Sequence, residues 1–388
     1  RLFDRNATTW SDDNRAAAFV TAKDPGVMQF AKNVAGLIPG ESQVDRNLRV
    51  AMAMHTAIAL FGMSYVPDPL RPYSETSQNE SVIDYLQFPR HTFQYRAGDC
   101  DDLAILYSSL LEAVQIETAF VTVPGHIYIA FALNQTPASA RKNFQHPEDL
   151  IFINDRVWLP FEVTEVEEGF LTAWRTGAAE WRTAAARETA GFFPVHKAWE
   201  LYESASLPDS GEPVDVPASG AVLAAYLQEY EAYVQQEIYP AVAAIESQIQ
   251  KSGGTPRLTN KLGVIFAKYS LLGRAEIEFR RALELDGNYS PALVNLGNLN
   301  LSIGDTQSAL EYYGRAYELN PDSPAALLGY ARANHKIENF GNVKVAYARL
   351  TELHPDLASR FKYLDLRGSE SEHAERAAEV RGEMIWDE

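Results

Sequence analysis

The sequence contains one cysteine, Cys100, among its 388 residues. A single cysteine excludes a disulfide within these residues, so stability cannot come from covalent cross-links. The paired cysteine and histidine spacing that zinc requires is also missing. We therefore predict no metal site and no cofactor.

Long apolar runs and an excess of positive charge are absent as well. No run approaches the roughly 20 apolar residues that span a bilayer, so we predict no membrane span. The chain has 34 Lys and Arg against 52 Asp and Glu, which gives a net charge of −18. Because a phosphate backbone requires a basic surface, we predict no nucleic-acid partner. The chain begins at Arg1 without a signal peptide. We expect that a targeting segment has been removed and that the protein is periplasmic or secreted.

The composition divides the chain into three parts. Residues 1–203 mix helical and strand patterns, with the densest motifs between residues 96 and 165. Residues 204–254 begin with "SASLPDSGEPVDVPASG", whose Ser, Pro and Gly content is typical of a linker, and continue as a connecting helix. Residues 255–388 form the third part, which repeats itself.

Small and aromatic residues recur 34 positions apart in this third part, as from Gly263 to Gly297 and from Phe279 to Tyr313. This period resembles the tetratricopeptide repeat, a pair of helices that stacks into an α-solenoid. A third copy, about 325–355, departs from the pattern. We expect the polar tail after Asp356 to form a capping helix. The resemblance implies a concave face that binds a protein or peptide, and we expect this face to be polar and acidic. The alternative is that the helices only stiffen the first part.

Cys100 lies at the start of a predicted helix, "DCDDLAILYSSLLEAVQI", whose apolar residues have helical spacing. Free backbone N–H groups and the helix dipole favour a thiolate at this position. Asp99, Asp101 and Asp102 oppose it, because negative charge raises a thiol's pKa. Carboxylates here are typical helix caps. A basic group must therefore lie beside the sulfur if it is to ionise.

His126 is the candidate for that basic group. It opens the second of two predicted strands around Pro124-Gly125 in "ETAFVTVPGHIYIAFAL". A second hairpin is predicted over residues 150–166, turning at Asn154-Asp155, and Glu162 lies on its second strand. A carboxylate beside the histidine strand can orient the imidazole. Glu162 is the first choice for this role, and Asp155 is the alternative.

The order of cysteine, histidine and carboxylate in "RAGDCDDLAILYSSLLEAV", "VPGHIYIAF" and "WLPFEVT" resembles the transglutaminase-like branch of the papain-type cysteine enzymes. The resemblance implies an α+β core, a helix packed on an antiparallel sheet, with Cys100 as nucleophile and His126 as general base and acid. Family members usually have an aspartate where this chain has Glu162. The oxyanion would be stabilised by the backbone N–H of Cys100 and by an upstream side chain. The candidates for that side chain are Gln94, ranked first, Tyr95 and Trp10.

We therefore expect thiol-dependent acyl transfer on protein or peptide amides, with either water or an amine as the acceptor. Two alternatives stay open. The first is a catalytically silent transglutaminase-like domain in a scaffold for protein interactions. The second is a bacterial enzyme that acts on cell-wall peptides.

Overall fold

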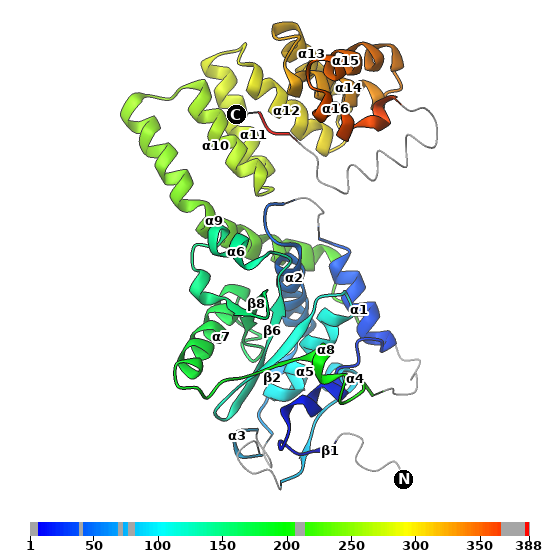
Figure 1. The fold of residues 1–388 in the computed structure, drawn as a ribbon, viewed down its shortest axis with the longest axis vertical. Coiled ribbons are helices and arrows are strands. Elements are labelled where there is room, and N and C mark those ends of the chain that lie inside the picture. Colours follow the sequence, from blue (N-terminus) through cyan, green and yellow to red (C-terminus); the bar gives the residue numbers. More distant parts are fainter. Residues whose placement is uncertain are drawn as a thin grey trace. The chain divides into compact units, whose positions relative to one another are not determined.

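The computed structural model describes residues 7–38, 42–68, 73–76, 82–205, 214–365 and 385–387 (Figure 1). The chain forms two compact units. The first comprises residues 1–39 and 44–237, and the second comprises residues 40–43 and 238–388. The division falls inside the long helix α9 (Ser219–Ser252), within the region 204–254 that the sequence assigned to a linker and connecting helix.

A five-stranded antiparallel sheet lies at the centre of the first unit, in the order β7-β8-β6-β5-β9. Two tight hairpins build most of it. The first joins β5 (Thr118–Val123) to β6 (His126–Ala132) through Pro124 and Gly125, whose φ is +77°. The second joins β7 (Ile151–Ile153) to β8 (Arg156–Phe161) through Asn154 and Asp155, which both have positive φ, as a type I′ turn requires. Both hairpins were predicted from the sequence.

The fifth strand, β9 (Gly191–Pro194), was not predicted. The sequence of residues 166–203 reads as helical, and most of it is: α7 (Phe170–Ala185) and α8 (Val195–Ala198) flank the strand. β9 pairs with β5 at the edge of the sheet. A four-residue edge strand forms because it pairs with its neighbour in the sheet, so the local sequence gives little indication of a strand.

Two helices cover opposite faces of the sheet (Figure 1). Helix α5 (Cys100–Glu112) packs on the face that carries the apolar row of β6, and its Tyr107 lies 5.8 Å from the ring of Phe161 on β8. Helix α2 (Arg46–Phe61) adds His55, which is buried against the same Phe161. Helix α7 covers the other face. The remaining elements of this unit are β1 (Ala7–Thr8), η1 (Asp13–Phe19), α1 (Pro25–Ala35), β2 (Ser64–Tyr65), α3 (Tyr73–Thr76), β3 (Asp84–Tyr85), α4 (Pro89–Tyr95), β4 (Ala97–Gly98), α6 (Pro137–Asn143) and η2 (Pro147–Asp149).

Helix α7 accepts hydrogen bonds from the sheet through its backbone carbonyls. The N–H of Glu162 donates to the carbonyl of Ala173 at 3.0 Å, and the Tyr128 hydroxyl donates to the carbonyl of Gly177 at 3.0 Å. A Cβ at Gly177 would lie 3.0 Å from the backbone nitrogen of Phe161 and 3.1 Å from that of Glu162. The absent side chain therefore lets the helix approach the strand.

The second unit consists of stacked helix pairs. The pairs are α10 (Pro256–Lys268) with α11 (Leu272–Leu285), α12 (Ser290–Ser302) with α13 (Thr306–Leu319), and α14 (Pro324–Lys336) with α15 (Phe340–Leu353). Two short elements follow, α16 (Pro355–Arg360) and η3 (Lys362–Asp365). The first helices of successive pairs contact one another. The region that the sequence described as a departing third copy is thus a regular helix pair.

The 34-residue recurrence marks the places where helices meet. A Cβ at Gly263 would lie 2.5 Å from the ring of Phe279, and one at Gly297 would lie 2.6 Å from the ring of Tyr313. Each glycine therefore accommodates the aromatic ring of the second helix of its pair. Of the predicted capping helix, residues 366–384 lie outside the described part of the chain. Ile385–Asp387, near its end, have no helical structure.

Substituting Gly177 with alanine should destabilise the first unit by about 1–3 kcal/mol, because the new methyl group meets backbone atoms that cannot rotate away. Gly220→Ala in α9 is the matched control, since its Cβ would have no neighbour within 4 Å. Denaturant unfolding of the full chain measures both variants. Equal stability of Gly177→Ala and wild type would contradict the close approach of α7 to β8.

Candidate active site

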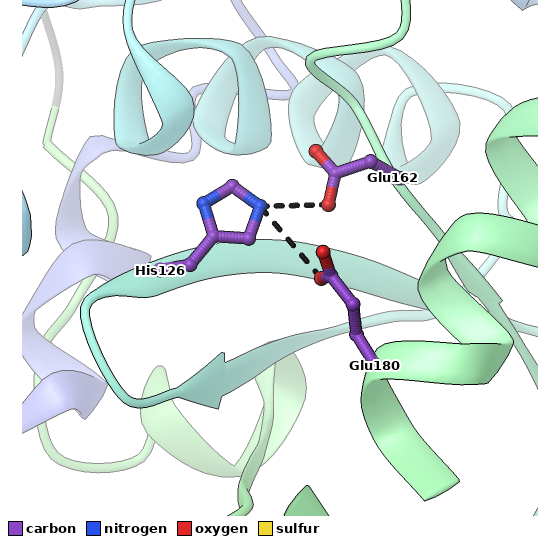
Figure 2. Close-up of side chains that lie close together, drawn as sticks. All are labelled: His126, Glu162 and Glu180. Atoms are coloured by element: carbon purple, nitrogen blue, oxygen red, sulfur yellow. Dashed lines mark hydrogen bonds and ion pairs between the residues drawn. The ribbon is translucent and has the colours of Figure 1, made fainter. Parts of the chain in front are cut away.

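His126 and Glu162 are in direct contact. His126 is the first residue of β6, and Glu162 follows the last residue of the neighbouring strand β8. The strand register pairs Ile129 with Phe161, so Glu162 projects to the same face as His126. The Nε2 atom of His126 lies 2.7 Å from Oε2 of Glu162 (Figure 2). The Glu162 carboxylate is held in turn by the Thr164 backbone N–H at 2.9 Å and by the Thr164 hydroxyl. Asp155, the sequence alternative, is exposed in the β7–β8 turn.

Cys100 lies beside the start of the histidine strand. It is the first residue of α5, and the side chain of Asp99 caps the helix by accepting from the Asp102 N–H at 3.4 Å. The backbone N–H of Ile127, the residue next to His126, acts on the Cys100 sulfur and lowers its pKa. Within the described residues, no hydrogen bond joins this sulfur to the His126 ring. The second ring nitrogen, Nδ1, points away from the carboxylates (Figure 2).

The electrostatics around Cys100 favour the neutral thiol. Burial raises the pKa of Cys100, and the charges of Asp101 and Asp99 raise it further, while the Ile127 N–H opposes them. Only 4% of the residue is exposed. From the sequence we expected His126 to hold the sulfur as a thiolate, because the helix dipole, the aspartates and a nearby base could be weighed there but the burial could not. Desolvation outweighs the dipole here, so the resting group is the thiol.

His126 and Glu162 shift each other's pKa in opposite directions. Burial lowers the pKa of His126, but the hydrogen bond and charge of Glu162 and the charge of Glu180 outweigh it, so the net shift is upward. Burial raises the pKa of Glu162, yet the bond to His126 and those from Thr164 bring it below its usual range. Glu162 therefore favours the imidazolium form of His126.

The three aspartates around Cys100 have raised pKa values, and Asp102 bonds to neighbouring groups of the fold. Burial, followed by the charge of Asp99, raises the pKa of Asp102 to about 8. Asp102 accepts hydrogen bonds from the backbone N–H and side-chain amide of Gln87. Burial also raises the pKa of Asp99 and raises that of Asp101 strongly, with their mutual interaction adding to the shift at Asp101. A Cβ at Gly98 would lie 2.7 Å from Cβ of Asp102, so the glycine of the motif makes room for this side chain.

Glu180 was not predicted from the sequence. It lies on α7 one turn after Gly177, on the helix face that contacts β8, and its Oε2 is 3.9 Å from Nε2 of His126 (Figure 2). Burial, followed by the charge of Glu162, raises the pKa of Glu180 to about 7. Helical spacing relates Glu180 to Gly177 and Ala173, but nothing in the sequence indicated which face of α7 meets the sheet.

The upstream oxyanion candidates lie apart from the sulfur. Gln94 and Tyr95 are exposed on α4, and no hydrogen bond joins either side chain to Cys100 in the described part of the chain. Trp10 donates its indole N–H to Asp84 at 2.8 Å. Tyr65 is the better-placed group. β2 pairs with β4, which sets Tyr65 opposite Gly98, and burial followed by the charge of Cys100 raises the pKa of Tyr65.

Two groups of side chains have ligand atoms close enough to hold a cation. They are Asp99 with Asp101 and Asp102, and His126 with Glu162 and Glu180; in each group the atoms lie within 4.8 Å of one another. The sequence argument against a metal used cysteine and histidine spacing, so it did not consider carboxylates that the fold brings together. In each group one carboxylate oxygen, Oδ2 of Asp101 and Oε2 of Glu180, is buried and has no hydrogen-bond partner among the described residues.

Comparison with known proteins identifies the repeats. A tetratricopeptide repeat family model matches residues 300–364. We found no significant match among curated proteins. Among the described residues, no helix has the length and apolar character needed to cross a membrane.

Replacing Glu180 with glutamine should change two pH-dependent quantities. Removing a charge 3.9 Å from Nε2 should lower the His126 pKa, because the charge of Glu180 helps to raise it; NMR of the ring protons measures the change. The pKa of Glu180 rises from its ordinary 4.5 to about 7 in the fold, so ionising it costs stability as pH rises through this window. The variant should therefore melt about 2–4 °C above wild type at pH 8, and at the same temperature as wild type near pH 4.

Glu167→Gln is the control, because this glutamate is exposed and lies in the same loop and helix region. An unchanged His126 titration in Glu180→Gln would mean that Glu180 does not act on the histidine in solution.

Proposed function

We propose that the first unit catalyses thiol-dependent acyl transfer on protein or peptide amides through Cys100, His126 and Glu162, as a transglutaminase-like cysteine enzyme. The observation that carries the proposal is the chain of contacts at the start of β6. His126 is held by Glu162 through Nε2, and the backbone N–H of the next residue, Ile127, lowers the pKa of the Cys100 thiol. This chain leaves Nδ1 of His126 as the atom that exchanges a proton with the thiol.

The first half of the reaction forms a thioester. The Cys100 sulfur bonds to the amide carbonyl carbon while its proton passes to Nδ1 of His126. The backbone N–H of Cys100, one of the free N–H groups at the start of α5, and the Tyr65 hydroxyl donate to the oxyanion. The carbon–nitrogen bond then breaks as His126 returns the proton to the departing amine.

In the second half, water or an amine attacks the thioester carbon and gives its proton to His126. The carbon–sulfur bond breaks, the sulfur regains the proton, and an acid or a new amide is released. Glu162 stabilises the imidazolium that forms in each half. Because the resting sulfur is a thiol, His126 acts as a general base during attack and must be neutral beforehand.

The second unit binds a protein in this proposal. The match of residues 300–364 to a tetratricopeptide repeat supports protein–protein interaction. A scaffold without catalysis is the second candidate function, and one observation favours it: the Cys100 thiol is buried and its pKa is raised.

Alkylation of Cys100 separates the two candidates. If the site is catalytic, iodoacetamide should label the folded protein, and the rate should increase with pH through the His126 pKa, which lies above its ordinary 6.5. His126→Ala should slow labelling about tenfold or more, since the thiol loses its base. His146→Ala is the matched control, because His146 is exposed and bonds to Glu148. Labelling that requires unfolding would support the scaffold.

Turnover on casein-like chains and on short peptides, followed by ammonia release and mass spectrometry of new termini or cross-links, tests the reaction itself. Cys100→Ala should abolish activity, and His126→Ala should reduce it by about 10²–10⁴-fold. Glu162→Gln should reduce it less and shift the acidic limb of the pH profile downward, because the His126 pKa falls. Activity that survives Cys100→Ala would refute the proposal.

A further inference from the structure

The last described residues of the chain, Ile385–Asp387, bind to the second unit through main-chain atoms. The side-chain amide of Asn295 on α12 pairs with both backbone groups of Asp387: it donates to the carbonyl at 2.8 Å and accepts from the N–H at 2.8 Å. Asn260 on α10 donates to the same carbonyl at 2.8 Å. Asn298 on α12 donates to the carbonyl of Ile385 at 2.8 Å. We call these three residues the asparagine surface.

The amides of the asparagine surface are also held by neighbouring side chains of the second unit. Asn295 donates to Oδ1 of Asn260 at 3.0 Å, and Tyr313 donates its hydroxyl to Oδ1 of Asn298 at 2.7 Å. These bonds orient the free N–H groups toward the segment. The residues are 0–3% exposed with the segment in place. Buried amides without partners are costly, so this surface needs main-chain groups or water opposite it.

Side chains of the segment fill two apolar positions. The Trp386 ring is stacked on Phe279 of α11, with ring centres 6.2 Å apart and planes 20° apart. Ile385 packs against the apolar cluster of α14 and α15 that includes Leu328 and Val343. The main-chain bonds are independent of sequence, whereas these two contacts select an aliphatic residue followed by an aromatic one.

The surface therefore has the properties of a peptide-binding site with a ligand already in it. We infer that the asparagine surface binds extended peptide segments with an aliphatic–aromatic pair, and that Ile385–Asp387 of the same chain is its resident ligand. Because the segment belongs to the chain, its effective concentration is high and a partner peptide must displace it. The inference does not depend on catalysis at Cys100. The groups that meet the segment are polar amides and apolar rings, and the predicted polar and acidic character of the concave face stays a prediction.

The state of the resident segment can be measured in the full chain by hydrogen exchange of the Asp387 amide, followed by NMR. This N–H donates to Asn295, so it should exchange at least about tenfold more slowly than in an unstructured peptide. Asn295→Ala should remove the protection. Asn300→Ala on the same helix should not, because Asn300 bonds to the carbonyl of Leu296 in its own helix. Exchange at the unstructured rate in wild type would overturn the inference.

Displacement is tested with a fluorescent peptide, Met-Ile-Trp-Asp-Glu, and full-length variants. Trp386→Ala loosens the resident segment, so this variant should bind the peptide about tenfold or more tightly than wild type. Adding Asn295→Ala should abolish that binding, and a peptide with alanine for tryptophan should bind neither protein. Thermal unfolding of Trp386→Ala confirms that the repeats are intact. A folded Trp386→Ala variant that binds no peptide would show a fixed intramolecular contact and refute the binding site.

Discussion

The candidate site depends on the contact between His126 and Glu162 across two neighbouring strands. A 2.7 Å contact between an imidazole and a buried carboxylate requires the strands to be in register, and it requires α7 to hold the chain after β8. Gly177 makes this possible, because it lets the helix backbone approach the strand backbone. The same approach brings Glu180 to the histidine. One glycine on the far side of the sheet from Cys100 thus shapes the charge environment of the proposed base.

Two opposing electrostatic arrangements meet at this site. On the α5 side, burial raises the pKa of the Cys100 thiol and the pKa values of the three aspartates beside it. On the α7 side, two glutamates favour a charged imidazole. In a cysteine enzyme with a preformed ion pair, the resting sulfur is a thiolate, whereas here the environment of Cys100 favours the neutral thiol. In the mechanism proposed here the proton leaves the thiol only as the sulfur attacks, when the developing charge moves onto the substrate oxygen.

The second unit binds the segment Ile385–Asp387 through hydrogen bonds to its backbone rather than through charged side chains. Its buried asparagines present amides that match a peptide backbone, and its glycines allow the aromatic residues that orient them to fit closely. Tyr313 does both: its ring packs against Gly297, and its hydroxyl fixes Asn298. The recurrence that stacks the helices therefore also positions the groups that bind the segment.

Local patterns in the sequence were sufficient for much of this molecule. Alternating apolar residues and the Pro124-Gly125 and Asn154-Asp155 turns predicted both hairpins, and the 34-residue recurrence predicted the helix pairs. The order of motifs selected His126 and Glu162, which the structure brings into contact. These signals are local because turn chemistry and periodicity depend on near neighbours in the chain. The tertiary structure alone decided the rest: the edge strand β9, the burial that neutralises Cys100, the approach of Glu180, and the place of Ile385–Asp387. Each depends on contacts between residues far apart in sequence, and desolvation in particular is a property of everything packed around a group rather than of its own motif.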